Sequence, residues 1–163
     1  MPALVSAEVM EATWEHVGAS SGARVLAMQK ECGKRQQELS GFVVGYTATL
    51  SPEAIGLALY AYVVIFQAFK RSGAALRKIG DAGILRQWEA TGQHLAGPQA
   101  TGGRLESLLP SVECSERIVL AYIAGALSHD QEDPVDLTDE EYWHIARVLI
   151  TATECLHQAQ KTR

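Results

Sequence analysis

The chain has 163 residues, of which 47% are hydrophobic and 20% charged, which excludes an intrinsically disordered protein and allows one well-buried core. Its formal net charge of −5 disfavours a duplex-binding domain, because such domains carry a strongly basic face. Three cysteines without a C-x-x-C pair provide neither a disulfide framework nor a zinc module. No basic-then-apolar leader follows Met1, so we expect one domain over residues 1–163 and a cytoplasmic location.

The charge is unevenly distributed along the chain. Residues 1–69 carry a net charge of −2, residues 70–104 carry +4, and residues 105–163 carry −7. Basic and acidic segments of this kind can meet within one chain or between chains, or bind a partner of opposite charge. The low charged fraction leaves few residues to cover the surface of a monomer, so we also expect self-association as a homodimer.

The N-terminal part of the sequence predicts two amphipathic helices. Ser6 is a suitable N-cap for a short helix over residues 7–17, and the glycines and serines of 18–22 interrupt it. A second helix is expected over residues 23–47, because apolar side chains recur on one helical face. Gln36 interrupts this apolar stripe, and we expect its amide to reach the solvent at the edge of the helix. The alternative is a polar residue in the helix interface that fixes the register or the number of packed helices.

The most apolar segment covers residues 54–66 and has the sequence AIGLALYAYVVIF. Ser51 and Pro52 before it are typical of a helix start, and the cations and glycine of residues 70–73 are typical of a helix end. A helix that is apolar on every face must be surrounded by protein or by lipid. These 13 residues are too few for a bilayer, which takes about 20, so we expect a core helix and no membrane contact.

The second half of the chain predicts further helices separated by clear connections. Asp81 is placed to cap a helix over residues 82–95, and the glycine-rich segment near 96–104 is expected to be a mobile loop. A second strongly apolar helix is expected over 113–127. An acidic connection follows it over residues 129–138.

The last helix has the clearest start signal. Thr138 and Glu141 match the capping-box pattern T-x-x-E, and apolar residues then recur with helical spacing up to Leu156. Because no segment alternates like a strand, the sequence predicts an all-α fold. We expect a single-domain bundle of about five to seven helices, with the two strongly apolar helices near 54–69 and 113–127 adjacent in its centre.

Two copies of the pattern E-x-x-H lie in the last helix, at Glu141–His144 and Glu154–His157. This spacing puts a carboxylate and an imidazole on one helical face, as in di-iron helical bundles. The two copies are 13 residues apart on one helix, or about 20 Å, whereas a di-metal site needs ligands on facing helices. We therefore interpret both copies as chance matches and expect no metal and no cofactor.

Two connecting segments are superficially similar to ligand-binding loops. Residues 130–141 contain seven acids, but Pro134 lies inside the segment and no glycine occupies the turn position of an EF-hand. Residues 97–104 are rich in glycine, but they lack the Lys–Ser/Thr pair and the preceding strand of a phosphate-binding loop. We expect both segments to be solvated connections.

The three cysteines and five histidines match no catalytic signature. Cys32 lies on an apolar helical stripe, where a thiol is usually an inert small hydrophobic group. An active site assembled from residues far apart in the sequence would leave no such signature. The sequence therefore favours a protein that is not an enzyme.

Five cations and a tryptophan between residues 70 and 88 form the candidate interaction surface. Helix C-termini favour cations, which accounts for the first two without any ligand. A helix-turn-helix is disfavoured because bulky residues precede the turn glycines, and nucleic acid is disfavoured with it. We expect an acidic protein partner to contact Lys70, Arg71, Arg77, Lys78, Arg86 and Trp88.

Aromatic residues provide the alternative, because helical bundles can bind small molecules between their helices. Tyrosine rings would give such a pocket apolar walls with polar tips. The candidate pocket residues are Tyr46, Tyr60, Tyr62, Phe66 and Tyr122. The sequence predicts a non-enzymatic binding or regulatory module that acts through protein–protein contacts, with a small-molecule sensor or carrier as the alternative and an enzyme or metalloprotein as the third reading.

Overall fold

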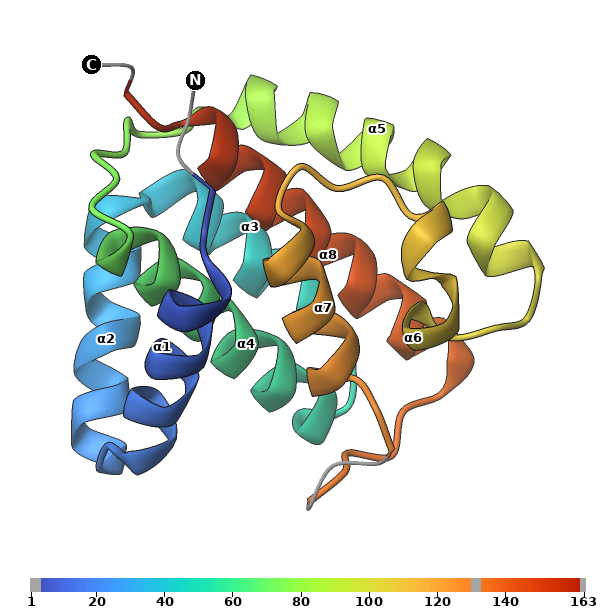
Figure 1. The fold of residues 1–163 in the computed structure, drawn as a ribbon, viewed down its shortest axis with the longest axis horizontal. Helices are drawn as coiled ribbons and strands as arrows, with labels where there is room; N and C mark the ends of the chain where they lie inside the picture. The colour runs from blue at the N-terminus through green and yellow to red at the C-terminus, as the bar shows by residue number, and fades with distance from the viewer. Residues whose placement is uncertain (1–3, 130–132, 162–163) are drawn as a thin grey trace.

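The computed structural model describes residues 4–129 and 133–161, and over these residues the chain is all-helical without a strand (Figure 1). The all-α prediction is confirmed, while the helices outnumber the five to seven expected. The α-helices are α1 (Ala7–Ala19), α2 (Gly22–Arg35), α3 (Gln37–Thr47), α4 (Pro52–Arg71), α5 (Asp81–Ala100), α6 (Leu105–Leu108), α7 (Arg117–Ala126) and α8 (Asp139–Gln158), with a 3-10 helix, η1 (Leu109–Ser111), after α6.

Hydroxyl side chains start four of these helices. Each accepts a hydrogen bond from the backbone N–H three residues further on, at 3.1–3.3 Å, and so satisfies a donor that has no partner within the helix. At the start of α8 the complete capping box is present, as the sequence predicts. The four capping residues are Ser6, Ser21, Ser51 and Thr138.

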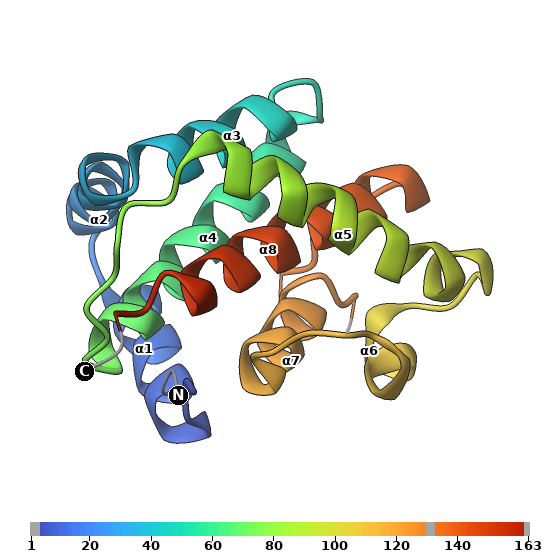
Figure 2. The same cartoon turned by 90° about the horizontal axis from the view of Figure 1, so that it is seen from above.

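The centre of the bundle is formed by α4 and α8. Eleven of the 20 residues of α4 are buried, including all of 61–69, and twelve of the 20 residues of α8 are buried. Seen from above, α8 lies between α4 and α5 (Figure 2), and it also packs against α3 and α7. Most of the core is therefore assembled around α8.

The sequence of α8 contains polar residues, so it does not indicate that this helix lies in the centre of the bundle. Thr151 and Thr153 are fully buried, and their hydroxyls donate to the backbone carbonyls of Arg147 and Leu149 at 2.6 and 2.8 Å. Because a threonine can satisfy its hydroxyl within its own helix, burial leaves no polar group without a partner. The central helix α8 is therefore less apolar in sequence than α7, although α7 has an exposed face.

The helix α7, the second predicted central helix, packs against α4 as expected but leaves one face open. Val119, Leu120 and Ile123 are buried, whereas Ile118 and Ala121 on the other side are exposed. The predicted central position of this helix is therefore not confirmed. Its apolar outer face becomes part of a surface groove.

The helix α4 is longer than its uninterrupted apolar run, because Gln67, Lys70 and Arg71 continue it to 20 residues. Among the described residues it is the one helix long and apolar enough to cross a membrane by length and composition. Within its apolar window, 61% of the residues are buried inside the protein. Such burial is typical of a core helix.

The helix expected over residues 23–47 is in fact two helices, which meet at Gln36. The backbone there has φ −130° and ψ 67°, outside the helical region. The side chain is 2% exposed, so the prediction of a solvent-exposed amide was wrong. Its Nε2 donates to the carbonyl of Arg77 at 2.8 Å, and its Oε1 accepts from the N–H of Ile79 at 3.1 Å. The amide is buried because a distant segment provides both partners.

The connection expected near residues 96–104 is largely helical. α5 runs through Pro98 to Ala100, five residues beyond the predicted end, and leaves only 101–104 between α5 and α6. Pro98 costs one hydrogen bond in the last turn, where few further bonds depend on it. The acidic connection is non-helical over 133–138, and its residues 130–132 lie outside the described part of the chain.

Candidate functional site

The segment 74–78, which follows α4, passes beside the end of α2 (Figures 1 and 2). A basic cleft of about 810 Å³ lies between this segment and α2. The buried ring of Phe66 and the alanines of both walls contribute to its apolar lining. Five cations and one acid line it. These charged residues are Lys30, Glu31, Lys34, Arg35, Lys70 and Lys78.

The one acid in the basic cleft is already engaged. The carboxylate of Glu31 accepts from Lys70 Nζ at 2.8 and 3.0 Å and from Gln67 Nε2 at 3.1 Å. The hydrogen bond from Lys70 is the main reason why the pKa of Glu31 lies below its ordinary value. No ion pair within the described residues involves the other three lysines of the cleft, which are Lys30, Lys34 and Lys78.

The second wall of the basic cleft is held in place from two sides. Gln36 at the end of α2 bonds to the backbone at Arg77, as described above. On the other side, the N–H of Arg77 donates to the carbonyl of Ala159, and the N–H of Lys161 donates to the carbonyl of Ala75, both at 2.8 Å. The cleft is therefore preformed by backbone hydrogen bonds to distant parts of the chain.

The structure brings together only part of the predicted partner-binding set. Lys70 and Lys78 line the basic cleft, whereas Arg71, Arg77 and Arg86 are exposed outside it. The cations of α2 were missed in the sequence, because they lie about 40 residues before the opposite wall. The one signal in the sequence that could have identified these cations as site residues is their spacing, which puts them about one turn apart on the same exposed face of one helix.

Trp88, the sixth predicted residue, belongs to an internal aromatic cluster. Its ring centroid lies 5.6 Å from that of Phe42 and 4.9 Å from that of Tyr46. The guanidinium of Arg147 lies 3.6 Å from the centre of the Trp88 ring and donates to the Trp88 carbonyl at 2.9 and 3.1 Å. The half-buried ring thus holds α5 against α3 and α8 and is not part of the basic cleft.

A second hollow, the apolar groove, has a volume of about 520 Å³. Its walls are α1 and α7, which lie on the same side of α4 when the molecule is seen from above (Figure 2), and α4 forms its floor. One charged residue, Glu11, lines it. Its larger apolar lining residues are Met10, Trp14, Leu57, Tyr60, Ile118 and Tyr122.

The five aromatic residues predicted to line one pocket are divided among three places. Tyr60 and Tyr122 line the apolar groove, on its floor and on its α7 wall. Tyr46 belongs to the aromatic cluster around Trp88. Tyr62 and Phe66 are buried core side chains, which is the usual role of such rings in a helix-lined interior.

The first E-x-x-H pattern is used in helix capping and packing. Glu141 accepts from the N–H of Thr138 at 3.2 Å in the capping box, and its second oxygen accepts from the N–H of Ser51 at 3.0 Å. His144 bonds through Nε2 to the backbone carbonyl of Tyr46. The two side chains therefore bind different parts of the chain.

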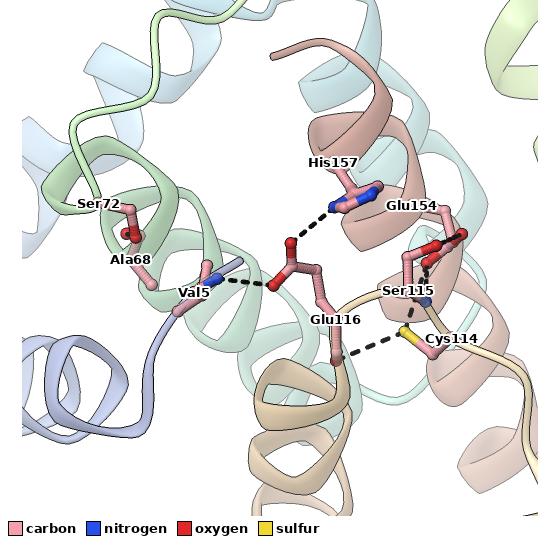
Figure 3. Close-up of polar contacts among 8 residues, drawn as sticks. All are labelled: Val5, Ala68, Ser72, Cys114, Ser115, Glu116, Glu154 and His157. Carbon is pink, nitrogen blue, oxygen red and sulfur yellow. Dashed lines mark hydrogen bonds and ion pairs between the residues drawn. The ribbon is translucent and has the colours of Figure 1, made fainter. Parts of the chain in front are cut away.

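The second pattern contacts the segment before α7 (Figure 3). The Glu154 carboxylate accepts from the N–H of Ser115 at 2.7 Å and from its hydroxyl at 2.9 Å, while His157 Nδ1 lies 2.7 Å from Glu116 Oε2. Within the described residues, no group of three or more His, Cys, Asp or Glu side chains is placed to hold a metal ion.

Glu116 is the buried carboxylate that links the walls of the apolar groove. Its side chain is fully buried at the N-cap of α7. Its Oε1 accepts from the N–H of Val5 at 2.8 Å, two residues before α1, and its Oε2 faces His157 on α8 (Figure 3). One side chain thus fixes the start of α1 to the start of α7.

The cysteines are unsuited to nucleophilic chemistry. Burial raises the pKa of Cys32, Cys114 and Cys155 to about 12. The nearby Glu154 carboxylate, 3.5 Å from Cys114 Sγ, further opposes formation of that thiolate. At neutral pH all three remain thiols, and a thiol is a much poorer nucleophile than a thiolate.

No protein-family model matches the sequence, and no curated protein and no solved structure matches it either. Over the described residues the chain is an all-α bundle whose surface hollows include a basic cleft and an apolar groove of different chemistry.

Proposed function

We propose that the protein is a non-enzymatic binding module whose basic cleft receives an acidic segment of a protein partner. The observation that carries this proposal is the convergence of five cations from two distant chain segments on one cleft with a single acid. Three of the lysines are exposed and have no ion-pair partner among the described residues. Carboxylates of a partner would supply the counter-charges without breaking an existing pair.

The shape of the basic cleft favours a peptide segment over a single small ion. Lys30 and Lys34 are four residues apart on α2, or about 6 Å along the helix axis. Alternate side chains of an extended peptide recur every 6.8 Å or so, which is close to this spacing. The apolar surface contributed by Ala27, Ala75 and the half-buried Leu76 can contact the residues between the acids. Because both walls are preformed, little ordering of the protein opposes binding.

The proposal is tested by titrating a fluorescently labelled Glu-rich peptide and measuring its anisotropy. In the variant Lys34→Glu/Lys78→Glu, one charge on each wall is reversed, and we expect the affinity to fall by at least about tenfold. The matched control is the variant Lys34→Glu/Arg24→Glu, and both double variants are compared with the single variant Lys34→Glu. Arg24 is also an exposed cation on α2, but it lies outside the cleft, about 15 Å from Lys34 along the helix.

Reversal of Arg24 should add little to the loss caused by Lys34→Glu, whereas reversal of Lys78 should add a further clear loss. If reversal of Arg24 lowered the affinity as much as reversal of Lys78, the peptide would be responding to the overall positive charge of the surface and not to the cleft. This result would contradict the proposal. An oligonucleotide of equal charge that binds more tightly than the peptide would also contradict it, because the cleft would then be a nucleic-acid site.

A further inference from the structure

We infer that the apolar groove binds a helix of a protein partner, one with an apolar stripe and basic residues beside it. This inference goes beyond the proposed function, because it concerns other residues and another kind of ligand. The variants of the basic cleft leave these residues unchanged, so each proposal can fail without the other.

The groove has the shape of a helix-docking site. Along α7, Ile118, Ala121 and Gly125 recur at helical spacing and line the groove with mostly small side chains, which permits close approach of another helix. Trp14 on the α1 wall is 56% exposed, and Ile118 is 37% exposed. A docked helix would remove this apolar surface from water on both walls at once, as in other helix-in-groove complexes.

The charges around the groove select the occupant. Glu11 lines it, and Glu8 and Glu15 lie on the same edge of α1, three residues before and four residues after it. Glu53 lies one turn before Leu57 on α4 and is exposed. No cation is among the lining residues.

The nearest cation in sequence, Arg117, is turned away from the groove, because its guanidinium donates to the carbonyls of Leu109 and Val112. A second copy of this chain would bring another acidic rim against the first. Lysines or arginines beside the apolar stripe of a partner helix would instead meet the four carboxylates. The charge complementarity therefore favours a basic amphipathic helix over self-association.

The probe for the test is a labelled peptide of about 18 residues, long enough to form a helix, with leucines at i, i+3, i+4 and i+7 and lysines beside them. A twin peptide has glutamates in place of the lysines. Each is titrated against the wild-type chain, against Ala121→Gln, and against the control Ala82→Gln. Both alanines are exposed and helical, but only Ala121 lines the groove, and glutamine adds bulk without charge.

We expect the lysine peptide to bind at least about tenfold more tightly than its glutamate twin and to lose about tenfold in affinity with Ala121→Gln only. Equal binding of the two peptides, no binding of the lysine peptide, or equal effects of the two glutamines would overturn the inference. A wild-type dimer in analytical ultracentrifugation that Ala121→Gln dissociates would overturn it too, since the groove would then belong to a second copy. Binding of an apolar dye that the peptide does not displace would assign it to a small molecule.

Discussion

The basic cleft and the apolar groove are built on the two halves of one helix. The C-terminal half of α4 contributes Phe66 and Lys70 to the cleft, and its N-terminal half contributes Leu57 and Tyr60 to the groove. In the cleft, charged residues line both walls, whereas Glu11 is the one charged residue that lines the groove and the other carboxylates lie beside it. The segments that cover α4 supply all the charged lining residues other than Lys70, so they largely determine the chemistry of each hollow.

The two hollows also share one device, a buried polar side chain that fixes a wall. Gln36 bonds the end of α2 to the segment that forms the opposite wall of the cleft. Glu116 bonds Val5, two residues before α1, to the start of α7, and these two helices are the walls of the groove. Since each of these side chains fixes a wall of one hollow only, a substitution of either should weaken binding at that hollow and leave binding at the other unchanged.

The largest effect is expected for Glu116→Ala. It leaves the N–H of Val5 and the ring of His157 without their shared partner and opens a cavity, so the free energy of unfolding should fall by about 3 kcal/mol in urea titrations. Affinity for the lysine peptide should fall, and affinity for the Glu-rich peptide should stay. The control Glu113→Ala, at an exposed position, should leave both unchanged. If Glu116→Ala lowered the affinity for both peptides equally, Glu116 would not act on the groove alone, which would contradict the prediction.

Gln36→Leu should give the next largest effect. The backbone carbonyl of Arg77 and the N–H of Ile79 lose their partners, which should cost about 2 kcal/mol of unfolding free energy. Here the Glu-rich peptide should bind more weakly and the lysine peptide as before. Gln37→Leu, at the exposed neighbouring glutamine, is the control in the same urea titrations. An unchanged cleft affinity would mean that the wall does not depend on this amide.

Salt should distinguish the two surfaces more mildly. Raising NaCl from about 0.1 M to about 1 M shortens the Debye length from about 10 to about 3 Å. We expect the Glu-rich peptide to lose at least about tenfold in affinity and the lysine peptide only about threefold, because apolar burial drives the second interaction. Anisotropy titrations at both salt concentrations provide the measurement. If the lysine peptide lost more affinity with salt than the Glu-rich peptide, charge attraction and not apolar burial would drive binding at the groove, which would contradict the prediction.

The smallest effect is expected for Glu31→Gln. The pKa of Glu31 is lowered from its ordinary value of 4.5, mainly by Lys70, so the folded pKa lies below the unfolded one. The carboxylate therefore stabilises the fold above pH 4.5, and this contribution is lost as the pH falls through the folded pKa. The variant should lack this part of the pH dependence in urea titrations.

At neutral pH, Glu31→Gln should also raise the affinity for the Glu-rich peptide about threefold, since Lys70 loses its internal counter-charge. Lysine-peptide binding provides the internal control and should not change. A weaker affinity of the variant for the Glu-rich peptide would show that Glu31 orders the cleft more than it competes with the ligand.

Local signals in the sequence were sufficient for much of the fold. The caps at Ser6, Ser51 and Thr138 lie where the sequence predicts them, and helical spacing identified α8. The break at Gln36 could not be predicted, because its hydrogen-bond partners lie 41 and 43 residues away. The central place of α8 was also concealed, since its buried threonines look polar in sequence.

The candidate surfaces were predicted only in part for the same reason. Clustering of cations along the chain identified Lys70 and Lys78, but the facing lysines of α2 become neighbours only in the fold. Tyr60 and Tyr122 were identified as pocket residues, whereas the exposed Trp14, which lines the same groove, was not. The homodimer expected from composition stays a prediction.

We thus propose that one bundle carries two separate binding surfaces of opposite chemistry. Amide correlation spectra of the isotope-labelled protein, recorded with each peptide in turn, test it most directly. We predict that the Glu-rich peptide shifts amides of α2 and residues 74–79, that the lysine peptide shifts amides of α1 and α7, and that the two sets do not overlap. Shifts of one common set by both peptides, or shifts scattered over the whole surface, would contradict the claim.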